Sequence, residues 1–139
     1  MPSFMEVWGI VAAELTPRPW VYTAPGGASV TVIPEGTARA AGEGVVVLRI
    51  TQDPHTSAEV YITTGELPDA RAALGCDTDA YYQEALAALL VAPTADGGVW
   101  LTVEPWDRAP ARLLLPAGQR LPLLAALERA ADVARGWEH

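Results

Sequence analysis

The stretch GGVWLTVEPWDRAPARLLLP, residues 97–116, contains the pattern that decides the fold of this chain. Two runs of β-compatible residues flank a short loop containing aspartate and proline, which is typical of an antiparallel hairpin. Successive side chains of a strand point to opposite faces of its sheet. One face of this hairpin therefore receives only aliphatic side chains, whereas the other receives Trp100 and Arg112. The alternation predicts a core on the first face and a candidate contact surface on the second.

The same alternation occurs upstream, in residues 45–64. The runs VVVLRITQD and SAEVYITT place aliphatic residues on one face of a second hairpin, and Arg49 and Tyr61 on the other. Further upstream, WVYTA and ASVTVIP flank a PGG turn within residues 20–34 and predict a third hairpin. A long β-compatible stretch from Ser3 to Leu15 precedes it. These runs indicate a chain dominated by antiparallel strands.

Helical patterns occur at three places. LPDARAAL, residues 67–74, predicts a short helix that ends at Gly75. A second helix is predicted from about Asp79 to Pro93, because four large apolar side chains recur with helical spacing at Tyr82, Leu86, Leu89 and Leu90. The last predicted helix begins near Arg120 and has a buried stripe of Leu123, Leu127, Ala130 and Ala134.

Residues 45–74 align without gaps with residues 98–127. Each segment has the order strand, loop, strand, glycine turn, helix, although identical residues are few. Two interpretations stay open: an internal β-β-α repeat, or two independent hairpin-helix units of a common kind.

Length and composition predict one domain over residues 1–139, because 139 residues with half of them apolar can form a single core. The expected fold class is α+β, mainly an antiparallel sheet with helices packed on one face. The single cysteine, Cys76, cannot form an internal disulfide, which favours a reducing, cytoplasmic setting. The longest nearly apolar run, Ala85 to Ala92, is too short to span a membrane. We therefore expect a soluble protein without membrane contact.

The charge balance argues against nucleic acid as a partner. The chain has 17 acidic and 9 basic residues, for a net charge of −8, and all basic residues are arginine. Affinity for nucleic acid comes largely from neutralising phosphates, which requires a basic surface.

Motifs for catalysis, cofactors and metals are missing from the sequence. Without lysine there is neither a P-loop lysine nor a Schiff base. One cysteine and two histidines do not support a zinc site. The stretch DPHTS, residues 53–57, combines an acid, a histidine and a serine, but neighbours in one loop rarely form a triad, so a turn is the better interpretation. We therefore expect no enzyme activity, no cofactor and no metal.

The polar and aromatic faces of the two hairpins are the candidate interaction surface. Tryptophan, tyrosine and arginine are enriched where proteins bind one another. The candidate residues are Arg49, Tyr61, Trp100, Trp106 and Arg112. Coverage of this face by the N-terminal strands is the alternative, since Phe4, Trp8 and Ile10 are also large and apolar.

The strand-strand-helix pattern of residues 45–135 resembles the architecture of the PUR and whirly group of single-strand-binding proteins. That resemblance implies binding of single-stranded nucleic acid through an aromatic sheet face. Size and acidity are similar to those of small α+β secretion chaperones, which implies dimers that hold partner segments. The function most consistent with the residues is a non-catalytic protein-interaction or scaffolding module, a homodimer through a sheet face or bound to another protein.

Overall fold

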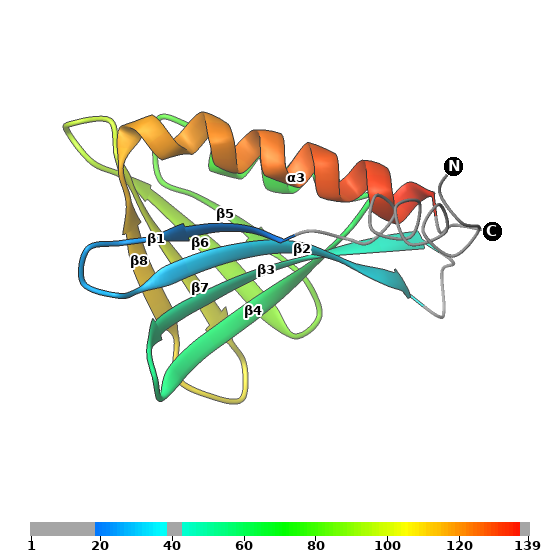
Figure 1. Ribbon diagram of the computed structural model, residues 1–139, viewed down its shortest axis with the longest axis horizontal. Helices are drawn as coiled ribbons and strands as arrows, with labels where there is room; N and C mark the ends of the chain where they lie inside the picture. Colours follow the sequence, from blue (N-terminus) through cyan, green and yellow to red (C-terminus); the bar gives the residue numbers. More distant parts are fainter. Residues whose placement is uncertain (1–18, 39–42, 137–139) are drawn as a thin grey trace, which may run out of the picture.

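The computed structural model describes residues 19–38 and 43–136, which form two four-stranded antiparallel sheets and two α-helices (Figure 1). The first sheet holds, in chain order, β1 (Trp20–Thr23), β2 (Ser29–Ala38), β3 (Glu43–Asp53) and β4 (Thr56–Thr63). The second holds β5 (Ala80–Gln83), β6 (Ala87–Pro93), β7 (Val99–Pro105) and β8 (Ala111–Leu115). Helix α2 (Leu67–Leu74) follows the first sheet. The 3₁₀ turn η1 (Ala117–Gln119) and helix α3 (Arg120–Arg135) follow the second. The predicted α+β class with antiparallel pairing is confirmed.

Two hairpins use the same glycine turn. In the β1–β2 turn the amide of Gly27 donates to the carbonyl of Ala24, and in the β6–β7 turn the amide of Gly97 donates to the carbonyl of Thr94. Both glycines have positive φ, 97° and 87°. A type I turn followed by a left-handed residue joins strands with three loop residues, and glycine adopts that conformation without strain. The PGG and DGG sequences therefore define where these strands reverse.

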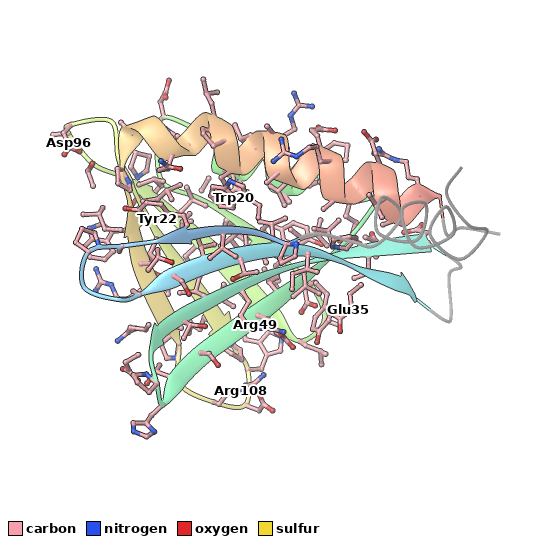
Figure 2. All side chains as sticks on the ribbon, in the orientation of Figure 1. Trp20, Tyr22, Glu35, Arg49, Asp96 and Arg108 are labelled. Carbon is pink, nitrogen blue, oxygen red and sulfur yellow. The ribbon has the colours of Figure 1, made fainter. Side chains whose placement is uncertain are left out.

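The core lies between the two sheets. In each sheet, alternate side chains point inward and are fully buried, as the alternation of the sequence predicted. Leu48 and Ile62 of the first sheet belong to the same buried cluster as Leu101 and Leu113 of the second. In Figure 1 the strands of the second sheet run steeply across those of the first. One apolar cluster thus connects all the described strands except the short edge strand β1, whose Trp20 and Tyr22 pack against it on the α3 side (Figure 2).

Both helices lie along one side of the molecule and contact each other (Figure 1). Helix α3 packs on β2 and β3, while α2 packs mainly beside β5. The stripe predicted for the last helix is confirmed, since Leu123, Leu127, Ala130 and Ala134 are all buried. Gly44 allows the close packing of β3 on α3, because a Cβ atom there would lie 2.5 Å from the carbonyl oxygen of Ala134.

The helix predicted from about Asp79 to Pro93 is wrong, because this segment forms strands β5 and β6. One carboxylate oxygen of Glu84 accepts hydrogen bonds from the amides of Leu86 and Ala87. These bonds close the turn between β5 and β6. Leu89 then pairs with Val103 across the sheet and is fully buried, whereas Leu86 and Leu90 are exposed. Pairing with β7 and burial override the helical propensity of the alanines and leucines.

The predicted strand from Ser3 to Leu15 lies outside the described residues. Residues 45–74 cover β3, β4 and α2, and residues 98–127 cover β7, β8 and the first half of α3. The two segments therefore contain the same elements in the same order, while a duplication of sequence stays a prediction. Of the helices in residues 19–38 and 43–136, none has the length and apolarity needed to cross a membrane.

Candidate interaction face

The outer face of the β5–β8 sheet is a row-by-row arrangement of large side chains. Strand register aligns Tyr81, Leu90, Thr102 and Arg112 in one row across all four strands. The neighbouring row contains Ala92, Trp100 and Leu114. Because residues two apart on a strand share a face, both rows point away from the core. The predicted exposed face of this hairpin is thus extended by β5 and β6.

Several apolar side chains on this outer face are open to solvent. Tyr81 is 67% exposed, Leu114 43% and Leu90 38%, while Trp100 is half-buried. Tyr81, Leu90 and Trp100, together with Thr102 and Arg112, line a hollow of about 490 Å³. Contiguous exposed apolar surface on a sheet is uncommon in monomers and marks contact sites.

Trp100 is held in place by its neighbour in the sheet. The guanidinium carbon of Arg112 lies 4.0 Å from the centre of the Trp100 ring. Arginine over a tryptophan face is attracted by the quadrupole of the ring, by about 0.5–1 kcal/mol at an exposed position. The pair presents a flat, ordered surface with the charge of Arg112 at its edge.

The charges on this face are asymmetric. Asp79, just before β5, lines the hollow on one side, and Arg112 on β8 lines it on the other. Neither makes an ion pair with any residue in the described ranges. The face therefore has an acidic edge and a basic edge with apolar side chains between them.

Arg49 and Tyr61 lie on a different sheet from Trp100 and Arg112, on the outer face of β3 and β4. There Arg49 forms a 2.7 Å ion pair with Glu59, and the Tyr61 hydroxyl donates a 2.6 Å hydrogen bond to the other oxygen of the same carboxylate. Figure 2 shows Arg49 near the same edge of the molecule as Arg108, and both line a small polar hollow with Glu59. Four of the five predicted residues are thus divided between two faces.

The Glu59 network shifts the pKa values of its members. Burial raises the pKa of Glu59, but hydrogen bonds from Tyr61 and Arg49 outweigh it, so the net pKa of this carboxyl is lowered. The hydrogen bond to Glu59, with burial, raises the pKa of Tyr61 to about 12. On the same face Val47 is fully buried. Around Glu59 this face is internally paired, in contrast to the open outer face of the β5–β8 sheet.

Trp106 belongs to neither row. It follows the end of β7, and its indole nitrogen donates a 2.8 Å hydrogen bond to the carbonyl of Ala85, while half of the side chain stays exposed. Its amide also donates to the carbonyl of Leu86. Trp106 therefore fixes the β5–β6 turn next to the sheet.

The residues considered for catalysis are separated. His55 is exposed in the β3–β4 turn, where its amide donates to Asp53, and Cys76 follows α2. Hydrogen bonding with Thr78 lowers the pKa of the Cys76 thiol. Neither His55 nor Cys76 lines the hollows around Trp100 or Glu59. Among the residues with described positions, no three histidine, cysteine or carboxylate side chains come together to hold a metal ion.

Tyr81 and Leu90 were not found as surface residues from the sequence, because the segment that carries them was predicted to be helical. The signal was available in ALLVA, residues 88–92, where buried Leu89 and Val91 alternate with exposed Leu90.

No protein-family model matches the chain, and no curated protein sequence matches it.

Proposed function

We propose that this chain is a protein-interaction module that forms a homodimer through the outer face of its β5–β8 sheet. The observation that carries the proposal is the continuous exposed surface of Tyr81, Leu90 and Leu114 around the half-buried Trp100. Burial of such side chains against a second copy removes apolar area from water, at about 25 cal/mol per Å². Trp100 within the surface and Arg112 at its edge are residue types enriched at interaction hot spots.

The charges of this face support a second copy over nucleic acid. Among the described residues that line the hollow, Arg112 is the only basic one, and Asp79 balances it. A stacking surface for single strands needs a groove of several basic side chains to follow the phosphates. A chain with net charge −8 repels phosphates, whereas an interface with equal and opposite charges at its two edges is self-complementary.

The edge charges also select one geometry for the dimer. Contacts in a two-fold dimer are isologous. If one residue of the first copy touches a second residue of its partner, the same two residues also touch with the copies exchanged. A two-fold axis parallel to the strands places the β5 edge of one copy over the β8 edge of the other. Asp79 of each copy then faces Arg112 of its partner, whereas an axis perpendicular to the strands would bring the two Arg112 side chains together.

A charge-exchange experiment tests this arrangement. We expect size exclusion with light scattering to show a dimer that dissociates on dilution. Arg112→Asp and Asp79→Arg should each weaken the association of the two copies. The double variant Asp79→Arg/Arg112→Asp should recover much of the lost affinity, because both pairs are restored with reversed sign. Arg129→Asp on the exposed side of α3 changes the net charge equally and should leave the dimer unchanged.

Three results would contradict the proposal. A monomeric mass at every concentration removes the homodimer, and a dimer insensitive to Arg112→Asp places the interface elsewhere. Quenching of tryptophan fluorescence by a single-stranded oligonucleotide, abolished by salt, would instead favour nucleic-acid binding through the same face.

A further inference from the structure

A second, independent surface feature is a cavity of about 510 Å³ at the end of the molecule away from the β1–β2 turn. Its walls come from β2, the start of β3, the end of β4, the residue before α2, β5 and the β5–β6 turn. Figure 2 shows Glu35 at this end of the first sheet. The volume is in the range of small-molecule sites.

Most of the cavity wall is apolar or aromatic. Val45 and Leu86 supply aliphatic surface, and the rings of Tyr61 and Tyr82 lie on the same lining. Leu86 is 65% exposed at the mouth of the cavity. An occupant therefore needs an apolar body to cover these side chains.

Three carboxylates share this lining with the apolar residues. They are Glu35, Glu66 and Glu84, and none of the described residues that line the cavity is basic. None of the three forms an ion pair with another residue of the described chain. Uncompensated negative charges beside apolar surface are stabilised by a cation, and strongly so where water is displaced.

The hydrogen bonds of Glu66 and Glu84 leave acceptor positions free for an occupant. Glu66 accepts a 2.5 Å hydrogen bond from the Tyr82 hydroxyl, which leaves its other oxygen. One oxygen of Glu84 accepts the amides of Leu86 and Ala87. Burial, with the carboxylates of Glu66 and Glu84, raises the pKa of Tyr82. Tyr82 therefore stays a neutral donor inside an acidic cavity.

The lining of the cavity favours an organic cation over a metal ion. No group of three histidine, cysteine or carboxylate side chains in the described part of the chain converges to hold a metal. Carboxylates beside aliphatic and aromatic side chains match an ammonium or guanidinium group attached to a carbon skeleton.

We propose that the cavity between β4 and the β5–β6 turn binds a small organic cation, an ammonium or guanidinium group on an apolar body. Glu35 and Glu66 receive the charged group, and Val45 and Leu86 cover the apolar body. The group comes either from a free amine or from a lysine or arginine side chain of a partner.

Calorimetric titration of the full chain with phenethylammonium chloride tests the cavity. We expect binding of the ammonium, with phenylethyl alcohol at least about tenfold weaker and phenylacetate weaker again, because only the charge differs. Glu35→Gln and Glu66→Gln should each lower the affinity for the ammonium by about tenfold. The surface control Asp107→Asn should leave that affinity unchanged. Glutamine at 66 still accepts the Tyr82 hydroxyl, so this variant keeps its fold.

Short blocked peptides separate the two sources of the cation. A peptide with one central lysine that binds more tightly than the free amine indicates a partner protein, and the reverse order indicates a free ligand. Equal affinity for the ammonium and the alcohol, an unchanged affinity in Glu35→Gln, or no binding of any cation would overturn the proposal. The cavity does not depend on the dimer, so each result stands apart from the charge-exchange experiment.

Discussion

At the scale of single residues, polar side chains in this protein are arranged by local partners on the sheet surface. The carboxylate of Glu59 forms an ion pair with Arg49 and accepts a hydrogen bond from Tyr61. Asp53 accepts a hydrogen bond from the amide of His55 in the adjacent turn. Cross-strand and same-face neighbours of this kind are the usual stabilising contacts of a sheet. Such pairs explain why this face carries charge without being a basic surface.

Tyr61 provides a prediction of pH dependence. Its pKa is raised to about 12 by the hydrogen bond to Glu59, from an ordinary value of 10.0. Because the folded pKa lies above the unfolded one, the stabilisation is fully present below the unfolded value and is lost as the pH rises through about 12. Unfolding free energies measured against pH in the wild type and in Tyr61→Phe should therefore converge toward the upper end of this window.

Spectrophotometric titration supplies the independent readout for Tyr61. The tyrosinate absorbance that develops near pH 12 should be missing in Tyr61→Phe and shifted to lower pH in Glu59→Gln. A titration of Tyr61→Phe identical to that of the wild type would contradict the assigned hydrogen bond.

At the scale of elements, the close packing of β3 on α3 depends on one missing side chain. Gly44 faces the last turns of α3, and a Cβ atom there would meet the backbone of Ala134. We expect Gly44→Ala to lower the free energy of unfolding by about 2 kcal/mol, because the strand and the helix must separate to admit a methyl group. Urea unfolding followed by circular dichroism measures the loss.

Gly26 is the matched control for this substitution. It lies in the β1–β2 turn without positive φ, and a Cβ atom there would meet nothing within 4 Å. Gly26→Ala should therefore leave stability unchanged or raise it slightly, by restricting the unfolded chain. Equal destabilisation by both variants would show that the contact of Gly44 with α3 is not the cause.

The β5–β6 segment shows why an element can be predicted with the wrong type. The segment has helix-forming residues at helical spacing. Its two strands nevertheless pair with each other, and β6 also pairs along its whole length with β7. Propensity differences of a few tenths of a kcal/mol per residue are smaller than the free energy of burying Leu89 and Val91 between sheets.

At the scale of the whole molecule, both sheets and both helices share one apolar cluster. Leu101, at the centre of β7, is fully buried within it. We expect Leu101→Ala to lower the free energy of unfolding by about 3 kcal/mol, since the cavity left behind touches both sheets. Near- and far-ultraviolet circular dichroism should still change together, as in a single domain.

Leu114, next to this core but pointing outward, is the comparison. It is 43% exposed on the outer face of β8, so Leu114→Ala should cost the monomer much less than Leu101→Ala. Two separate transitions in the wild type would contradict the single domain predicted from length and composition.

The sequence by itself determined three hairpins (β1–β2, β3–β4 and β7–β8), the short helix before Gly75 and the last helix. In those places the alternation, the glycines and the buried stripe all follow from local geometry with a period of two or of 3.6 residues. The same alternation separated Leu101 from Trp100, and so identified the core face and the open face of the hairpin at residues 97–116.

Tertiary structure alone decided which strands belong together. Contacts between residues far apart in the chain decide four features of the fold. They are the partition into two sheets, the strand conformation of β5 and β6, the separation of the Arg49 and Trp100 faces, and the cavity beside Glu35. Such contacts leave no periodic signal, because their free energy comes from surfaces that meet only after the chain has folded.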